Sequence, residues 1–273
     1  MTMRDWEEVL LAATERVRAK VTAIANEGDR SVSVGVGASG DKTILADREA
    51  EKILLDALVG EDGVRVLSEE AGVRGDASAG TLAVVDPLDG SSNFERGIPF
   101  YCTSIAIAEG ESLAEVTLGV VRDLVSGDVY VGRRGGGATK NGRAIRTSGA
   151  RKPSEAVVGI DLSRSTSDVV SRLSPLVSGV KRQVHLGANA LELCYLAEGK
   201  IDAFVDIRGE IRITDFAAAY LIAAEAGAVI TDEKGGELEP DFDLRERFSF
   251  VGSANEFIHK EILELCRKSG RSR

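Results

Sequence analysis

Two carboxylates, a glycine and two hydroxyls lie together in the stretch Asp86-Pro87-Leu88-Asp89-Gly90-Ser91-Ser92-Asn93-Phe94. Residues 81–85 before it are apolar and β-branched, which predicts a strand covered on both faces, with Asp86 at its carboxyl end. Open α/β sheets bind ligands at that edge. Two such close carboxylates repel one another unless a proton or a cation separates them, and oxygen ligands favour Mg²⁺. A solvated Asp-rich turn is the alternative.

Two further segments bring carboxylates to the ends of apolar runs. Residues 64–67 predict a strand, and Glu69 and Glu70 follow it directly. Residues 216–226 form an alanine-rich helical segment stopped by Gly227, with Asp215 expected as its N-cap. Helix capping alone would also explain Asp215. If Glu69 and Asp215 join the first pair, the four carboxylates predict a metal site.

In this order the three segments resemble the signature of the inositol monophosphatase and fructose-1,6-bisphosphatase superfamily, whose members are Mg²⁺-dependent sugar phosphatases. That signature is an acidic pair before a glycine, an Asp-Pro-x-Asp-Gly-Ser/Thr loop and an Asp-x-Ala-Ala helix start. The resemblance covers about residues 5–260 and includes the segments 39–43, 136–143 and 187–194. Asp206-Ile207-Arg208, with Arg212, looks most like the archaeal-type enzymes that act on inositol monophosphate and fructose-1,6-bisphosphate.

The resemblance implies an α/β fold, a layered α-β-α-β-α sandwich. The polar stretch 147–155 is the best candidate for a boundary between two halves. Residues 1–150 would form an N-terminal α+β half that carries most metal ligands. Residues 151–273 would form a C-terminal α/β half that carries Asp215 and substrate-binding residues.

The resemblance also assigns roles at the site. Two or three Mg²⁺ ions, for which Mn²⁺ can substitute, would be held by Glu69, Asp86, the Leu88 carbonyl, Asp89 and Asp215. Such ions screen a phosphate dianion, stabilise the leaving alkoxide and activate a water for in-line attack. The implied catalytic residues are Asp47, Glu69 and Ser91, of which Ser91 stands where many relatives have Thr. Asp47 could also be only a first-turn acid favoured by its helix dipole.

Substrate contacts are expected from residues in both halves: Asp89, Gly90, Ser91, Gly187, Glu192, Arg208 and Arg212. Arg208 and Arg212 could bind the second phosphate of a sugar bisphosphate, or they could pair with surface acids such as Glu210. Glu192 could accept hydrogen bonds from sugar hydroxyls, or it could merely cap its helix. The predicted activity is hydrolysis of inositol-1-phosphate and of fructose-1,6-bisphosphate by attack of a metal-activated water.

Three other functions compete with this one. A phosphatase that uses a phosphoaspartate needs Asp-x-Asp-x-Thr near the N-terminus, whereas Asp86 and Asp89 are three residues apart and lie mid-chain. A nucleotide phosphatase acting on 3'-phosphoadenosine 5'-phosphate would share the site and differ in substrate. A divalent-cation-binding module without catalysis would use the acids structurally.

Bulk composition excludes several classes of partner. With 273 residues, a formal net charge of -10 and no apolar run long enough to span a bilayer, the chain predicts a soluble cytoplasmic protein. The acidic charge argues against nucleic-acid and anionic-membrane surfaces. The cysteines at 102, 194 and 266 are odd in number and far apart, which indicates buried thiols rather than disulfides. A homodimer is expected from the resemblance alone.

Two local expectations complete the sequence analysis. His185 and His259 are each expected to be structural, because a single histidine in a strand or helix usually is. Residues 28–40 are rich in Gly and Ser and predict a mobile loop, which in the family often acts as a lid.

Overall fold

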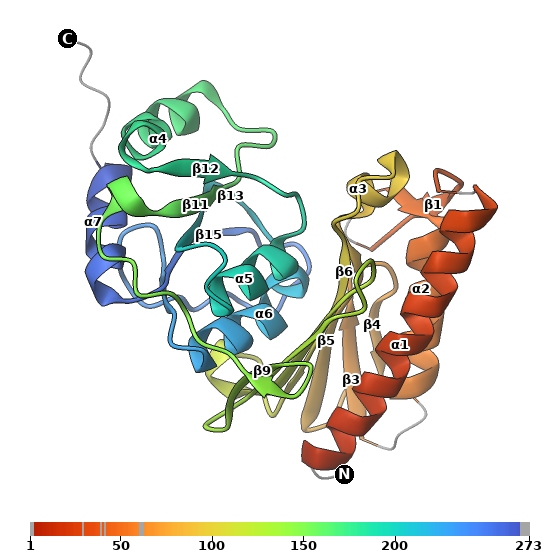
Figure 1. The fold of residues 1–273 in the computed structure, drawn as a ribbon. Helices are drawn as coiled ribbons and strands as arrows, with labels where there is room; N and C mark the ends of the chain where they lie inside the picture. The colour runs from red at the N-terminus through yellow and green to blue at the C-terminus, as the bar shows by residue number, and fades with distance from the viewer. Residues whose placement is uncertain (1–2, 29, 39, 41, 60–62, 268–273) are drawn as a thin grey trace.

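The chain folds into five stacked layers in which helices and sheets alternate, as the computed structural model shows for residues 3–28, 30–38, 40, 42–59 and 63–267 (Figure 1). The first layer holds α1 (Met3–Glu27) and α2 (Leu45–Leu58), which cover one face of a large sheet. Helices α5 (Asn189–Ala197) and α6 (Ile213–Glu225) lie between this sheet and a smaller one. Helices α4 (Ser167–Gly179) and α7 (Glu256–Arg267) form the last layer. This confirms the predicted α-β-α-β-α sandwich.

The large sheet contains eight strands within the described residues, in the order β10-β9-β8-β7-β6-β5-β3-β4. It is antiparallel except that β3 and β5 run parallel. The bounds of its strands are β3 Val64–Ser68, β4 Gly72–Gly75, β5 Thr81–Asp89, β6 Cys102–Ala108, β7 Val116–Asp123, β8 Val129–Arg133, β9 Gly137–Lys140 and β10 Arg143–Ala144.

The small sheet contains five strands of the described chain, in the order β12-β11-β13-β15-β14. Strands β11, β12 and β13 are parallel, and β15 runs antiparallel to β13 and β14. The bounds are β11 Val157–Ile160, β12 Arg182–Val184, β13 Ala203–Ile211, β14 Val229–Thr231 and β15 Phe248–Ser253. A hairpin of β1 (Ser33–Val36) and β2 (Lys42–Ile44) and a short helix α3 (Ser91–Arg96) complete the fold around the site.

The large sheet is buried on both faces because it separates two hydrophobic cores. Apolar side chains of α1 and α2 pack on one face, and those of α5 and α6 pack on the other. Every residue of β5 from Leu82 to Asp89 is buried, as its continuous apolar run predicts. The acids at the end of this strand therefore lie in a protein interior rather than on a solvated turn.

Two glycines let α6 lie directly on the large sheet. A Cβ atom built on Gly119 of β7 would lie 2.5 Å from the Ala218 carbonyl oxygen. A Cβ atom built on Gly132 of β8 would lie 2.8 Å from the Cα of Ile222. The absence of side chains at these positions fixes how closely α6 approaches the sheet. Since Asp215 is on the first turn of α6, this contact also fixes its position.

Three local expectations need correction. Asp215 was expected as the N-cap of its helix, but α6 begins at Ile213, so Asp215 is the third residue and Arg212 is the N-cap. The helix starts earlier because the Ile213 side chain packs in the core. Residues 28–40, expected as a loop, contain β1, whose backbone pairs with β2; residues 29, 39 and 41 lie outside the described residues. Asp86 does not end its strand, because β5 continues with an irregular register to Asp89.

The expectation for the cysteines is confirmed. The three cysteines are free and buried. Asn141 and Gly142 both have positive φ and form a tight turn between β9 and β10. Among the described residues, no helix combines the length and apolar character that crossing a bilayer requires. The boundary between the two predicted halves stays a prediction, since α5 and α6 from residues 189–225 pack on the large sheet of the first half.

Candidate active site

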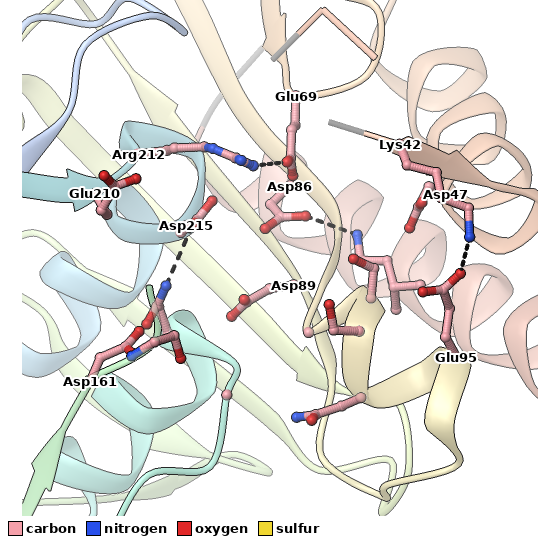
Figure 2. A pocket seen from close by; sticks show the side chains of 18 of the residues that line it. Lys42, Asp47, Glu69, Asp86, Asp89, Glu95, Asp161, Glu210, Arg212 and Asp215 are labelled. Carbon is pink, nitrogen blue, oxygen red and sulfur yellow. Dashed lines mark hydrogen bonds and ion pairs between the residues drawn. The ribbon is translucent and has the colours of Figure 1, made fainter. Parts of the chain in front are cut away.

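A cavity of about 500 Å³ lies where the N-terminal and C-terminal segments meet (Figure 2). All the residues that the sequence proposed for the site line this cavity except Glu192. They are Asp47, Glu69, Asp86, Leu88, Asp89, Gly90, Ser91, Gly187, Arg208, Arg212 and Asp215. Their positions in the sequence span nearly 170 residues, so the fold alone gathers them.

Glu69 and Asp86 meet because their strands are parallel neighbours. Ser68 at the end of β3 pairs with Val85 of β5, and the Glu69 amide donates to the Val85 carbonyl oxygen over 3.2 Å. The next residues along each strand therefore emerge side by side at the same sheet edge. The Leu88 amide donates to Asp86 Oδ1 over 2.9 Å and fixes the orientation of that carboxylate.

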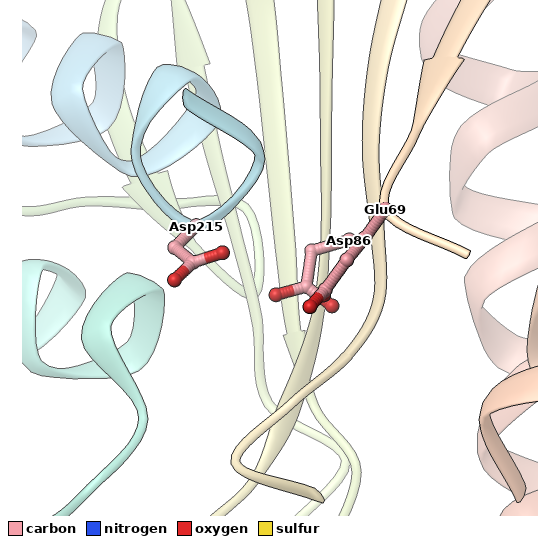
Figure 3. A group of neighbouring side chains, drawn as sticks. All are labelled: Glu69, Asp86 and Asp215. Atoms are coloured by element: carbon pink, nitrogen blue, oxygen red, sulfur yellow. The ribbon is translucent and has the colours of Figure 1, made fainter. Parts of the chain in front are cut away.

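Asp215 reaches the same point from α6, on the other side of the cluster (Figure 3). One carboxylate oxygen from each of Glu69, Asp86 and Asp215 lies within 4.8 Å of the others. Asn189 of α5 donates to Asp215 Oδ2 over 3.5 Å. The three acids thus present oxygen atoms to one small volume.

Asp89 lies beside this cluster and is held by the C-terminal segment. Its Oδ2 accepts a hydrogen bond from the Ala190 amide over 2.7 Å, and the Cys102 thiol lies 3.6 Å from the same oxygen. Burial and the charge of Asp215 raise the pKa of Asp89 well above its ordinary value. One oxygen of Asp89 therefore has a structural role, while the side chain still lines the cavity.

The electrostatics of the cluster fit a bound cation. Burial, and then the charges of Glu69 and Asp215, raise the pKa of Asp86 well above its usual range. Burial, together with Asp215 and other acids, does the same to the pKa of Glu69. Arg212 donates to Glu69 Oε1 and is one compensating cation. Buried carboxylates in such proximity need protons or metal ions, and a set of oxygen donors suits a hard divalent ion.

Asp47 lies at the start of α2, across the cavity from α6 (Figure 2). Its Oδ2 accepts from the Ile44 amide over 2.8 Å, so it also caps its own helix. Burial is the main cause that raises the pKa of Asp47 to about 8, and the charges of Glu70, Glu95 and Glu51 add to it. A side chain with a pKa near neutrality at a cavity wall is suited to proton transfer.

Gly90 and Ser91 form the turn into α3. Gly90 has φ +88° and is the N-cap, and a Cβ on it would lie 3.0 Å from the Phe100 carbonyl oxygen. The amides of a first helical turn have no acceptor within the helix. The Ser91 side chain and this turn both line the cavity, which gives a polar wall beside the carboxylates.

Arg208 is engaged by acids other than the one that the sequence suggested. Its guanidinium donates to both oxygens of Asp206, over 2.9 Å and 2.6 Å, and pairs with Asp161 over 2.6 Å. It also donates to the Ser163 carbonyl oxygen over 2.8 Å. Asp206 and Asp161 are buried, so the pairing with Glu210 that the sequence allowed is replaced by an internal network.

Glu192 does not line the cavity, because it lies beneath the Gly187 segment and is fully buried. Its Oε1 accepts from the Leu186 and Gly187 amides, over 3.0 Å and 2.9 Å. Burial raises the pKa of Glu192 to about 7. Asn93 of α3 clamps the same segment by donating to the Leu186 carbonyl oxygen over 2.7 Å. In the structure Glu192 therefore positions Gly187; a direct sugar contact stays a prediction.

Sequence reasoning missed a group of cavity residues in the C-terminal half: Asp161, Ser163, Arg164, His185 and Asn189. His185, expected to be structural, lies at the cavity with Nε2 3.0 Å from Ser163 Oγ. These residues could have been found from their position after strands. Residues 161–166 and 185–189 follow β11 and β12, which are parallel, and ligands bind at the carboxyl ends of the strands in open α/β sheets.

Comparison with known proteins agrees with this geometry. The family model described as the inositol monophosphatase family matches residues 5–271. The chain belongs to the inositol monophosphatase family. It is 37% identical over 263 residues to a protein of Thermococcus kodakarensis named fructose-1,6-bisphosphatase/inositol-1-monophosphatase, with 96% of this chain and 98% of that protein covered. A protein of the same name from Methanothermobacter thermautotrophicus is 35% identical, with 95% of each chain covered.

Solved structures of the family share the fold. A crystal structure titled inositol monophosphatase–fructose 1,6-bisphosphatase superposes with a TM-score of 0.86 at 32% identity, covering 95% of this chain and 99% of that one. A Pyrococcus horikoshii protein described as having similarities to inositol-1 monophosphatase gives 0.83 at 30% identity, covering 99% and 100%. The family consists of metal-dependent phosphatases, and the carboxylate cluster described above can hold a metal.

Proposed function

We propose that this protein is a Mg²⁺-dependent phosphatase that hydrolyses inositol-1-phosphate and fructose-1,6-bisphosphate. The observation that carries the proposal is the convergence of Glu69, Asp86 and Asp215 within 4.8 Å, beside the first turn of α3 in one cavity. Relatives that carry both activities in their names support the choice of substrates.

Glu69, Asp86, Asp89, Asp215 and the Leu88 carbonyl would hold two or three Mg²⁺ ions, for which Mn²⁺ can substitute. When bound, the ions offset the charge of the phosphate and of the leaving oxygen. The amides of Gly90 and Ser91 bind the phosphate oxygens at the start of α3. These groups orient the phosphorus for attack from the side of Asp47.

Ser91 and Asp47 would position the attacking water. The Ser91 hydroxyl accepts one hydrogen bond from this water and aims its lone pair at the phosphorus. Asp47 takes the proton, for which it must be ionised. Cations at the carboxylate cluster would lower the pKa of Asp47 from about 8, so a bound metal would favour the ionised base. Arg212 orients Glu69 through their ion pair.

Phosphate release from inositol-1-phosphate, fructose-1,6-bisphosphate and 3'-phosphoadenosine 5'-phosphate, with and without Mg²⁺, tests the proposal. We expect Mg²⁺-dependent release from the first two and loss of at least 10³-fold in kcat for Asp89→Asn. Activity on the adenosine compound alone would identify a nucleotide phosphatase. Metal binding without release from any of the three would indicate a divalent-cation-binding module and refute the proposal.

We further propose that the enzyme works in the cytoplasm as a homodimer, with small-molecule phosphates as its partners and no nucleic-acid or membrane partner. The acidic composition supports the last two exclusions. Light scattering of the purified chain would measure the oligomeric state directly. A monomer at micromolar concentration would contradict this part of the proposal.

A further inference from the structure

Glu51 of α2 is a buried carboxylate that the hydrolysis described above does not use. Its side chain is 8% exposed and does not line the cavity. Its Oε1 accepts hydrogen bonds from the Ser68 hydroxyl and from the Ala71 amide, each over 2.6 Å. Burying a carboxylate is costly unless strong hydrogen bonds compensate for the lost water. Both of these bonds come from one short segment, so Glu51 ties α2 to that segment.

The segment is the turn between β3 and β4, and it carries Glu69. Ser68 pairs with Gly72 across the turn, so residues 69–71 form its tip. Ser68 precedes Glu69 directly, and Ala71 follows two residues after it. Glu51 therefore holds the turn on both sides of Glu69, whose carboxylate belongs to the cluster with Asp86 and Asp215.

The β1–β2 hairpin contacts the same turn through Glu70. The Ala38 amide donates to the Glu70 carbonyl oxygen over 2.8 Å, and the Thr43 hydroxyl donates to the Glu70 carboxylate. These contacts hold the tip of the turn, whereas Glu51 holds the residues at its two ends. A glutamate side chain reaches its ligand position only if its backbone is fixed, so the anchor at Glu51 bears directly on Glu69.

Glu51 follows Asp47 by four residues on α2, so the two side chains lie on the same face of the helix. Figure 2 shows Asp47 and Glu69 at the cavity, and they come from different elements. We propose that Glu51 is a positioning residue that locks the β3–β4 turn to α2 and so fixes Glu69 relative to Asp47 for metal binding. This inference rests on the proposed function, in which Glu69 holds a metal ion and Asp47 receives the proton.

A role in folding alone makes a different prediction. If Glu51 only stabilised the protein, its removal would lower Tm and leave the metal affinity of the folded molecules unchanged. If it positions Glu69, the folded variant binds metal more weakly. Glu51→Ala removes the acceptor, whereas Glu51→Gln keeps an oxygen that can accept from both donors. The difference between these two variants therefore measures the hydrogen bonds rather than the charge.

Calorimetric titration of Mn²⁺ into the metal-free protein, without substrate, tests the inference. Glu51→Ala should raise the Kd for Mn²⁺ about 10- to 100-fold, as expected for loss of a group that holds a metal ligand. Glu51→Gln should retain most of the affinity. Ser68→Ala should weaken binding less than Glu51→Ala, and the two changes together should not add, because they break the same contact. Glu49→Ala, the same change on the same helix at a residue that pairs with Lys20, is the matched control and should leave the Kd unchanged.

Phosphate release gives a second measurement. The Mg²⁺ concentration for half-maximal activity should rise in Glu51→Ala by a factor similar to that for the Mn²⁺ Kd, and saturating Mg²⁺ should recover much of kcat. A fold defect would not be reversed by metal in this way. Thermal unfolding of each variant shows whether the protein is folded at the assay temperature.

The outcomes separate the two levels of inference. A wild-type protein that neither binds Mn²⁺ nor releases phosphate would refute the proposed function and this inference with it. If the wild-type protein does both and Glu51→Ala keeps the wild-type Kd, the inference is wrong and the proposed function stands. If Glu51→Ala does not fold, Ser68→Ala decides: a wild-type Kd in that variant would overturn the inference, and a raised Kd would support it.

Discussion

Replacing Asp86 by Asn should stabilise the metal-free protein while it removes activity. Asn keeps the shape of the side chain and an oxygen for the Leu88 amide, which donates to Asp86 Oδ1 over 2.9 Å. It removes one charge from a group in which Glu69 and Asp215 oxygens lie within 4.8 Å. The cost of holding these charges together without a cation therefore falls.

The size of the effect follows from this geometry. Two unit charges 4.8 Å apart repel by about 3.5 kcal/mol at an effective dielectric constant of about 20. Because burial raises the pKa of Asp86 and of Glu69, the cluster retains protons and only part of this repulsion is present. We expect Asp86→Asn to gain about 1–3 kcal/mol at pH 8 in a chelator, which is about 2–4 °C in Tm for each kcal/mol.

Calorimetry in EDTA and then in Mg²⁺ tests this reasoning. With Mg²⁺ the order should reverse, because the wild-type protein gains more from the ion than the variant does. Asp123→Asn is the matched control, since Asp123 is buried, caps the turn at Val125 and lies outside the cavity. A lower Tm for Asp86→Asn than for wild type in EDTA would refute the claim that these carboxylates repel one another in the folded protein.

Three more predictions concern the elements that support the site. Gly119→Ala should lower the free energy of unfolding by about 1–3 kcal/mol and reduce kcat, because the new methyl group forces α6 away from the sheet. Gly149→Ala should do neither, because no atom lies within 4 Å of the new methyl group. Equal effects of the two changes on chemical denaturation and on turnover would contradict this. Arg208→Gln should cost about 3–5 kcal/mol by urea unfolding, since two buried carboxylates lose their cation, and the exposed change Arg16→Gln should cost almost nothing. In EDTA, Tm should fall as pH rises from about 4 to about 8. Because the pKa of Asp47 is raised to about 8 in the folded protein, the folded state binds a proton that the unfolded state has lost, and this stabilisation disappears as Asp47 ionises. A Tm that rises over this range would show that the pKa of Asp47 is not raised in the folded protein.

Local patterns predicted many of the elements and the carboxylates that meet at the cavity. The continuous apolar run before Asp86 predicts a strand covered on both faces, and β5 is buried along its length. Glu69 and Asp86 could be recognised because each follows an apolar run. The few residues of such a run are enough to indicate that the acid after it lies at the edge of a buried sheet. The order of the three acidic segments carried the family resemblance, and the family match agrees with it.

Tertiary structure decided the parts that depend on distant neighbours. The partners of Arg208 were open in the sequence, since which carboxylate lies within 4 Å depends on the pairing of β11 with β13. Helix α5 places Glu192 under Gly187, where two backbone amides donate to it, so its position depends on a segment that the local sequence does not reveal; the expected contact with a sugar stays a prediction. Ser163 and His185 carry no local mark of function, because only the parallel arrangement of β11 and β12 brings their loops to one cavity wall. The sequence alone thus determined which residues could hold a cation. The packing of α5, α6 and the small sheet decided which other residues line the cavity, because helix position and strand pairing depend on contacts between segments far apart in the chain.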